Sequence, residues 1–190
     1  ARSIMTTDTV PKMASAKVKI SNQIVTIGGV AKGSGMIAPN MATMLAFLCT
    51  DAAVHPAVLS HWLQTGCRNS FNRITIDGDT STNDCLLIMA SGYAGNQLLD
   101  AVESEQSRLF GTTLEAVLLD LAKQIVYDGE GATKFIEIQV TGAKDSETAK
   151  SVAFTIAHSP LVKTAFFGED ANWGRVVAAA GRSGVPIIPE

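Results

Sequence analysis

The sequence predicts a layered α/β (α+β) sandwich with mixed sheets. Three observations favour this class: strand-like apolar patterns at 18–27 and 136–140, an amphipathic helix at 113–126, and the absence of a regular strand–helix–strand repeat. The chain has 190 residues, of which 46% are hydrophobic and 17% charged. That composition can bury a core and excludes a disordered chain.

A pair of strands is expected near the start of the chain. Residues 18–20 and 24–27 are rich in β-branched residues, and Ser21-Asn22-Gln23 between them is typical of a turn. Gly28-Gly29 is expected to end the second strand and to open a glycine-rich loop, GGVAKGSG, at 28–35.

Three later segments also have strand character. Residues 44–49 form a short apolar run, and residues 86–90 are apolar throughout, which predicts a buried strand. Ile136, Ile138 and Val140 alternate with polar residues, which predicts a half-buried strand.

Helical spacing recurs between these strands. The clearest helix has Thr112 or Thr113 as its expected N-cap, and Gly66 is expected to end an earlier helix. Pro160 is expected to interrupt a later helical stretch, and Asn172 to cap the last helix, with Arg175 exposed or paired with a carboxylate. The ranges expected to be helical are 52–65, 97–109, 113–126, 146–165 and 173–180.

Charge and composition exclude several classes of function. Fifteen Lys+Arg against eighteen Asp+Glu give a net charge of −3, so no extended nucleic-acid surface is expected. No apolar run reaches the ~18–20 residues of a membrane span. Cys49, Cys67 and Cys85 form no CxxC pair, which indicates reduced thiols in a protein of the cytoplasm or of the mitochondrial matrix.

The polar motifs do not match the common cofactor or metal patterns. The glycine-rich loop lacks the spacing of a P-loop and of a dinucleotide-binding motif, and DGDTSTND at 77–84 lacks the glycine and acidic positions of an EF-hand. The three histidines form no HExxH motif. We therefore expect no metal and no cofactor, and an ordinary polar turn at 77–84.

One peptide bond has the chemistry of a self-cleaving site. Ala42 leaves its carbonyl open to attack by the Thr43 hydroxyl, and cleavage would give Thr43 a free amine. Such an amine has a pKa near ~8 and can act as the general base for its own hydroxyl. The pattern is short, and most Ala-Thr pairs before a strand are only that.

Five blocks of sequence carry a stronger signal together. They are TTDTVPK (6–12), AKGSGMIAPNMATMLAF (31–47), ITIDGDTSTND (74–84), DGEGATKF (128–135) and GEDANWGR (168–175). Their order along nearly the whole chain resembles the ornithine acetyltransferase family, the bifunctional glutamate N-acetyltransferases of arginine biosynthesis. The resemblance implies the autoprocessing fold of that family, which is similar to that of the N-terminal-nucleophile aminopeptidases.

The resemblance assigns roles to particular residues. It implies cleavage between Ala42 and Thr43, with Thr43 as the nucleophile, and substrate binding by Thr6, Lys32, Thr43 and Glu130. Lys32 would pair with a carboxylate of the substrate and Glu130 with an amino group. The oxyanion hole is expected in a segment that precedes TTDT in the family.

The resemblance also implies boundaries, substrates and partners. Residues 1–42 would end the family's first subunit and residues 43–190 would form most of its second, so we expect the central part of the enzyme. The acetyl group would pass from N2-acetylornithine to glutamate through acetyl-Thr43, and acetyl-CoA serves some members as a donor. The expected assembly is an αβ heterodimer or a heterotetramer.

Two other functions remain open at this point. The chain could belong to an N-terminal-Thr amide hydrolase or aminopeptidase, in which water instead of glutamate takes the acyl group. It could also be an inactive, incomplete fragment.

Overall fold

The computed structural model describes residues 1–38, 44–80 and 84–186. The chain divides into two compact units, Ala1–Glu130 and Gly131–Glu190, and each is described by itself. This division concerns packing, so the expected subunit boundary after residue 42 stays a prediction.

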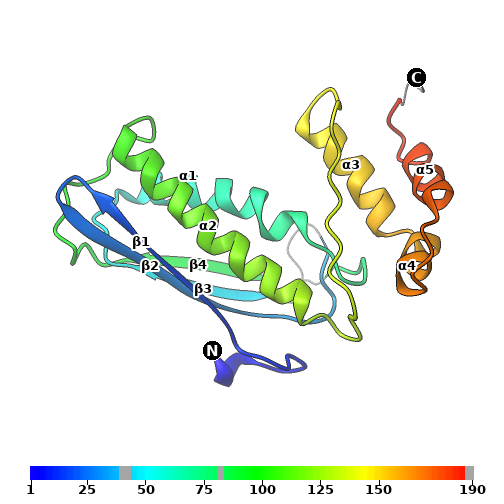
Figure 1. Cartoon of the computed structure of the whole chain (residues 1–190). Coiled ribbons are helices and arrows are strands. Elements are labelled where there is room, and N and C mark those ends of the chain that lie inside the picture. The colour runs from blue at the N-terminus through cyan, green and yellow to red at the C-terminus, as the bar shows by residue number, and fades with distance from the viewer. Residues whose placement is uncertain (39–43, 81–83, 187–190) are drawn as a thin grey trace. The chain divides into compact units, whose positions relative to one another are not determined.

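The first unit is built on one four-stranded mixed sheet (Figure 1). A short 3-10 helix, η1 (Arg2–Ile4), precedes the strands. The strand order is β1-β2-β3-β4; the first two pairs are antiparallel and β3 with β4 is parallel. The strands are β1 (Lys12–Ile20), β2 (Gln23–Lys32), β3 (Leu45–Thr50) and β4 (Cys85–Ala90).

The predicted turn between the first two strands is confirmed. Ile20 pairs with Gln23, and Ser21 takes a positive φ of 54° in the turn. The prediction that Gly28-Gly29 ends β2 is wrong, because the strand continues to Lys32. A Cβ on Gly29 would lie 2.8 Å from Leu48 Cγ, so this glycine lets β2 and β3 pack closely.

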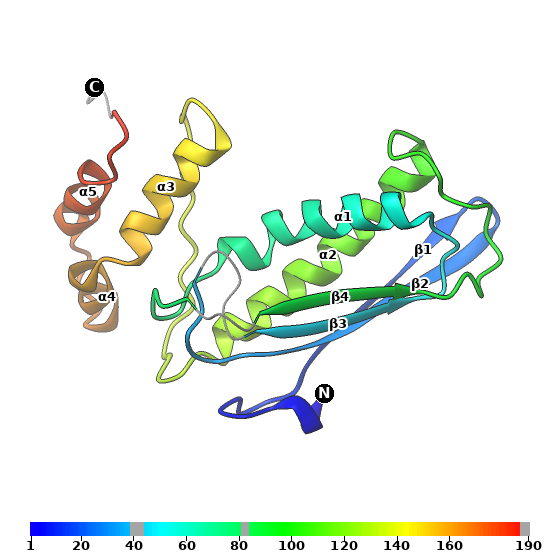
Figure 2. The same cartoon turned by 180° about the vertical axis from the view of Figure 1, so that it is seen from behind.

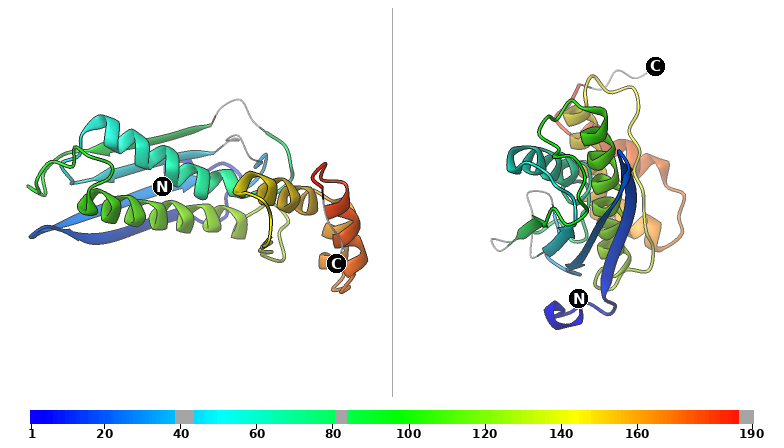
Figure 3. Two further views of the ribbon diagram at one scale, coloured as in Figure 1. Left: turned by 90° about the horizontal axis from the view of Figure 1, so that it is seen from above. Right: turned by 90° about the vertical axis from the view of Figure 1, so that its left-hand side faces the viewer.

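Two long helices cover one face of the sheet (Figures 2 and 3). They are α1 (Pro56–Asn69) and α2 (Glu105–Tyr127), with a 3-10 turn, η2 (Phe71–Arg73), after α1. Gly66 does not end α1, because it lies where Leu118 of α2 packs; a Cβ there would be 2.5 Å from Leu118 Cδ1. The prediction that Gly66 ends the helix is therefore wrong, because this glycine serves the packing of α1 against α2.

The helix predicted at 113–126 is the second half of α2. The helix begins earlier, at Glu105, and its cap is Ser104, whose hydroxyl accepts the Ser107 N–H. Thr112 and Thr113 are therefore not caps; their hydroxyls donate to helical carbonyls one turn back. The helix predicted at 97–109 is correct only from residue 105.

The core lies between the helices and the sheet. Inward-facing residues of α2 are fully buried there, against the inward face of β2 and β3. Burial of side chains of this size contributes about 1.5–3 kcal/mol each. The largest fully buried apolar residues are Phe110, Ile20, Ile27, Leu48, Leu114, Leu118, Leu121, Ile125 and Val25.

The opposite face of the sheet carries a row of apolar side chains. Met13, Val30, Phe47 and Leu87 are register partners across all four strands, and Met13 and Leu87 are 60% and 49% exposed. The strand at 86–90 is thus confirmed, but its complete burial is not. Leu86 and Ile88 pack against the core, whereas Leu87 and Met89 are exposed.

The second unit contains three helices, α3 (Ser146–Ala157), α4 (Pro160–Phe167) and α5 (Trp173–Gly181). Val152, Ile156, Val162 and Ala179 form its small core. The break at Pro160 is confirmed, because Pro160 begins α4.

The strand predicted at 136–140 is wrong, since that segment has no strand in the structure. Ile138 and Val140 instead pack against the helical core of this unit. Asn172 caps α5 as predicted, and its side chain accepts the Arg175 N–H. Arg175 itself donates to the Leu161 carbonyl and the Thr164 hydroxyl, not to a carboxylate.

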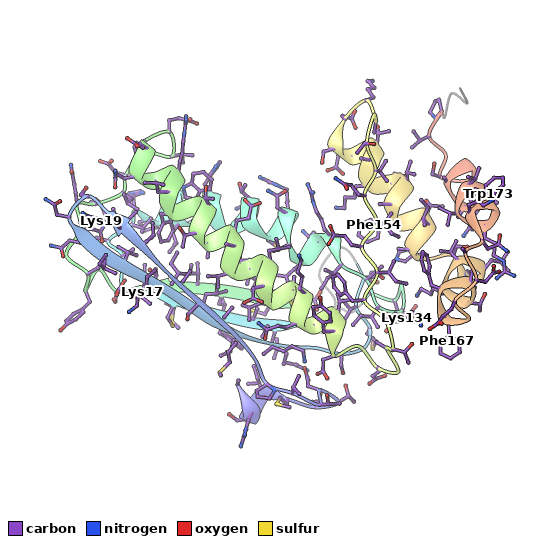
Figure 4. All side chains as sticks on the ribbon, viewed as in Figure 1. Lys17, Lys19, Lys134, Phe154, Phe167 and Trp173 are labelled. Atoms are coloured by element: carbon purple, nitrogen blue, oxygen red, sulfur yellow. The ribbon has the colours of Figure 1, made fainter. Side chains whose placement is uncertain are left out.

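Exposed aromatic side chains mark the surface of α4 and α5. Phe167 is 71% and Trp173 78% exposed, and Figure 4 shows both on the outside of these helices. The two units together confirm the mixed α/β class.

Candidate functional site

The TTDT segment meets the end of β2. Lys32, the last residue of β2, is buried, and its Nζ lies 3.4 Å from the hydroxyl of exposed Thr6. The structure therefore brings together two of the residues predicted to bind substrate. A lysine buried along its stem with its ammonium near the surface can bind a carboxylate.

Glu130 approaches the same place from the end of α2. Its N–H donates to the Ser34 carbonyl at 2.8 Å, and the Ser34 hydroxyl lies 2.6 Å from that of Thr7. A Cβ on Gly35 would lie 3.1 Å from Glu130 Oε2, so this glycine leaves the space that the carboxylate occupies. Glu130 is exposed and can meet an amino group in solution.

A buried ion cluster joins these segments. Lys12 Nζ lies 2.6 Å from both Asp8 Oδ1 and Asp128 Oδ2, and the three side chains are 0%, 0% and 5% exposed. Asp8 Oδ1 also accepts the Gly33 N–H at 2.7 Å. Thr9 donates its N–H to Asp128 at 2.9 Å and also donates its hydroxyl.

Hydrogen bonding keeps both carboxylates of this cluster ionised. Burial by itself would raise the pKa of Asp8, but donors from Gly33, Lys12 and Thr6 hold it below its ordinary value. Burial opposes ionisation of Asp128 as well, and the bonds from Lys12 and Thr9 lower its pKa in spite of that. The cluster thus holds one cation between two anions.

The loop after β2 has a conformation that favours glycine. Gly33 has a φ of 148°, a region that L-residues rarely adopt. Its N–H faces Asp8, so the backbone beside Lys32 is fixed by the same carboxylate that binds Lys12.

The two acidic ends of DGDTSTND hold the chain on both sides of residues 39–43. Asp77 accepts the N–H groups of Met36 at 2.5 Å and Ile37 at 3.1 Å, and Asp84 accepts the Met44 N–H at 2.8 Å. Ala42 and Thr43, the predicted cleavage site and nucleophile, lie outside the described residues.

Asp84 is the unusual carboxylate of this pair. Burial raises its pKa above the ordinary value against the opposing bond from Met44. Its Oδ2 is buried and has no hydrogen-bond partner among the described residues. A buried carboxyl with a raised pKa is typical of a functional position.

Within the residues that the structure describes, no group of three or more His, Cys, Asp or Glu residues could hold a metal ion. No helix in this part of the chain is long and apolar enough to cross a membrane. None of Cys49, Cys67 and Cys85, which all lie within the described residues, forms a disulfide.

No sequence pattern singled out Asp8, Lys12, Asp128 or Asp84. One signal for Lys12 was available, because a lysine occupies an inward-facing position of β1, opposite Ala31. The partners of that lysine could not be chosen from spacing, since Asp128 is 116 residues away.

Comparisons with known proteins agree on one family. The ArgJ family pattern matches residues 1–190. "Arginine biosynthesis bifunctional protein ArgJ" of Chlorobaculum tepidum is 58% identical over 190 residues, which are the whole of this chain and 46% of that relative. The protein of the same name from Caulobacter vibrioides is 55% identical over 189 residues, covering 100% of this chain and 47% of the relative.

A solved structure is similar as well. The crystal structure of the arginine biosynthesis bifunctional protein ArgJ of Bacillus halodurans superposes with a TM-score of 0.70 at 48% identity, covering 73% of this chain and 64% of that one. The chain spans about half the length of the curated relatives that it matches. The sequence match over all 190 residues and the shared fold place this chain in the ArgJ family.

Proposed function

We propose that this chain is part of an acetyltransferase of arginine biosynthesis that moves an acetyl group from N2-acetylornithine to glutamate. The observations that carry the proposal are the contact of Lys32 with Thr6 and the place of the Glu130 carboxylate beside Gly35, in the loop that follows Lys32. A cation and an anion at neighbouring positions suit a small amino acid with charges of both signs. The names of the relatives, which concern arginine biosynthesis, support the same pathway.

The charges suggest how the substrates bind. Lys32 and the Thr6 hydroxyl hold the α-carboxylate, and Glu130 holds the side-chain amino group of ornithine. The space beside Gly35 gives the Glu130 carboxylate its place. Glutamate lacks that distal amino group, so Lys32 and Thr6 are the groups common to both substrates.

Thr43 is the proposed nucleophile, made by self-cleavage. Its hydroxyl attacks the Ala42 carbonyl, and the peptide C–N bond breaks as the hydroxyl proton passes to the nitrogen, which leaves a free Thr43 amine and an Ala42–Thr43 ester. Water then hydrolyses the ester and releases the Ala42 carboxylate and the Thr43 hydroxyl. The bonds of Asp77 to Ile37 and of Asp84 to Met44 support this proposal, because they fix the described chain on either side of the proposed cleavage site.

The proposed acetyl transfer proceeds in two steps. Thr43 Oγ attacks the acetyl carbonyl of N2-acetylornithine, the amide bond breaks, and the hydroxyl proton passes through the Thr43 amine to the departing ornithine. The amine of glutamate then attacks the carbonyl of the acetyl-Thr43 ester, the acyl C–Oγ bond breaks, and a proton from the amine goes to Oγ, which gives N-acetylglutamate and free Thr43. An oxyanion hole, proposed in family residues that precede TTDT, would contribute roughly 3–4 kcal/mol per donor.

The remaining parts of the proposal follow the family resemblance. The enzyme needs no metal or cofactor, although acetyl-CoA is a candidate second donor. The two products of cleavage stay together as an αβ heterodimer, or as a heterotetramer, in the cytoplasm or, in a fungus, in the mitochondrial matrix.

The test of self-cleavage is the intact mass of the full-length gene product. Wild type should appear as two chains with the second beginning at Thr43, and Thr43→Ala should stay as one chain. Thr43→Ser keeps a hydroxyl and serves as the matched control, which should still be cut. Equal, uncut masses for wild type and Thr43→Ala would rule out cleavage through Thr43.

The test of acetyl transfer separates the transferase from the hydrolase. Wild type with N2-acetylornithine and glutamate should yield N-acetylglutamate; free acetate as the main product would identify a hydrolase. Lys32→Met should reduce transfer more than it reduces cleavage. Equal transfer by this variant and wild type would remove Lys32 from the site.

A further inference from the structure

The ion cluster of Asp8, Lys12 and Asp128 lies beside the expected substrate contacts without including any of them. We propose that Lys12 is a positioning residue of the acetyl-transfer site. By binding Asp8 and Asp128 at once, it fixes the segments that carry Thr6, Lys32 and Glu130. This inference rests on the function proposed above and deepens it.

On one side of Lys12, Asp8 fixes the backbone at Thr6 and beside Lys32. Asp8 Oδ1 accepts Lys12 Nζ at 2.6 Å and the Gly33 N–H at 2.7 Å, while Oδ2 accepts the Thr6 N–H at 3.3 Å. One carboxylate thus binds the backbone of Thr6 and of the residue next to Lys32. A displacement of Asp8 moves both contacts together.

The other side controls Glu130. Asp128 directly follows α2 and stands two residues before Glu130. Lys12 Nζ binds its Oδ2 at 2.6 Å, and the Glu130 N–H binds the Ser34 carbonyl at 2.8 Å. Glu130 is therefore anchored on one side through Asp128 and on the other through the loop after β2.

Only a cation can hold this arrangement. Lys12 is 0% exposed, and its ammonium has several donors to divide between the two carboxylates. Removing one partner of a buried ion group leaves an uncompensated charge. Without Lys12, two buried anions would repel one another, so they would separate or take up protons, and the segments bound to them would shift.

The experiment uses the full-length gene product with steady-state acetyl transfer from N2-acetylornithine. Lys12→Met should lower kcat/KM on the order of 10²-fold, mainly through KM, because displaced contacts bind substrate poorly. Lys17→Met is the matched control: Lys17 lies on the same strand, is exposed, and is labelled in Figure 4. It should leave both constants unchanged.

A second variant separates positioning from loss of packing. Asp128→Asn removes one of the two anions, so the double variant Lys12→Met/Asp128→Asn should recover part of the KM lost in Lys12→Met. Lys12→Arg keeps the positive charge, so its KM should stay closer to that of wild type than the KM of Lys12→Met does. If Lys12 acted only by filling space, neither the double variant nor Lys12→Arg should have a lower KM than Lys12→Met.

The outcomes distinguish this inference from the proposed function. If wild type transfers no acetyl group, the proposed function fails whatever the variants do. If wild type is active and folded Lys12→Met keeps the wild-type KM, the positioning role is wrong. Should Lys12→Met fail to fold, Thr9→Val, which removes a hydroxyl donor to Asp128, decides: a raised KM supports the role and an unchanged KM overturns it.

Discussion

At the scale of single residues, Gly35 shows how a small side chain shapes a charged site. The Cβ of any other residue at this position would lie 3.1 Å from Glu130 Oε2, closer than most real contacts. Gly35 has no positive φ, so alanine suits its backbone. The effect of a substitution is therefore on the position of the carboxylate.

Gly35→Ala should raise the KM for N2-acetylornithine on the order of tenfold, because a displaced charge pairs less well with the substrate. Thermal unfolding should not change, since Glu130 is exposed and can move. Steady-state kinetics and a melting curve of the full-length gene product test this. A KM equal to that of wild type would mean that Glu130 does not bind substrate.

Asp84 is a second single residue with a local effect, because it binds the backbone of Met44, the residue that follows Thr43. Asp84→Leu removes the acceptor of the Met44 N–H, which leaves a backbone donor unpaired at a cost of about 1–3 kcal/mol. Self-cleavage should slow, whereas Asp84→Asn keeps an acceptor and should retain it. A time course of intact mass decides, and equal rates for Asp84→Leu and Asp84→Asn would contradict the expectation.

At the scale of elements, glycines set the distance between α1 and α2. A Cβ on Gly111 of α2 would lie 2.3 Å from the Trp62 ring of α1, and Trp62 Nε1 donates to Ser107 on α2 at 2.8 Å. Gly66 of α1 likewise leaves room for Leu118 of α2. Glycine inside a helix normally costs about 1 kcal/mol against alanine, so its presence here reflects packing.

Gly111→Ala should destabilise the protein by about 1–3 kcal/mol, because overpacking against the half-buried Trp62 ring outweighs the gain in helix propensity. Gly181→Ala at the end of α5 is the control, since a Cβ there meets no atom within 4 Å and should be neutral or stabilising. Urea unfolding measures both. A stabilising Gly111→Ala would show that α1 and α2 pack less closely than described.

At the scale of the whole molecule, the buried ion cluster joins strand, helix and loops of the first unit, and its carboxylates make folding depend on pH. Asp8 and Asp128 have lowered pKa values when folded, so they stabilise the protein above the unfolded pKa of about 3.9. That stability is lost as pH falls through the folded pKa values. Asp84 has the opposite sign, because its raised pKa favours the protonated folded state.

The urea midpoint should therefore fall steeply below about pH 4. In Asp128→Asn, which cannot titrate at this position, the acid loss should be shallower although the stability at pH 7 is lower. Urea titrations at a series of pH values test this. Parallel acid limbs for wild type and Asp128→Asn would exclude a titrating role for Asp128.

The uncovered sheet face gives another property of the whole first unit. Met13, Val30, Phe47 and Leu87 form an apolar row on that face, and β4 is an edge strand. Exposed apolar rows of this kind promote association. Lys17 and Lys19 on β1 place charge at the other edge of the sheet (Figure 4).

The chain of residues 1–190 should self-associate as its concentration rises, and Leu87→Thr should weaken that association. Leu98→Thr is the control, because Leu98 is 51% exposed but lies outside the row. Sedimentation velocity at several concentrations measures the effect. Equal behaviour of the two variants would show that this face does not drive association.

Local signals succeeded where the cause was local. The turn at Ser21, the break at Pro160 and the cap at Asn172 were all predicted, since each depends on residues within a few positions. Gly66 and the Gly28-Gly29 pair misled because their partners, Leu118 and Leu48, lie elsewhere in the chain. A glycine that permits close packing looks the same in sequence as one that ends an element.

By itself the sequence determined the mixed α/β class, most of the elements, and the family, since ordered blocks and periodic apolar residues are properties of the chain. Only the tertiary structure decided that Lys12 bridges Asp8 and Asp128, that Lys32 meets Thr6, and that Glu130 meets the loop after β2. The physical reason is distance along the chain. Contacts across 116 residues form only when the strand and helix fold together, and no local pattern encodes which carboxylate meets the buried ammonium.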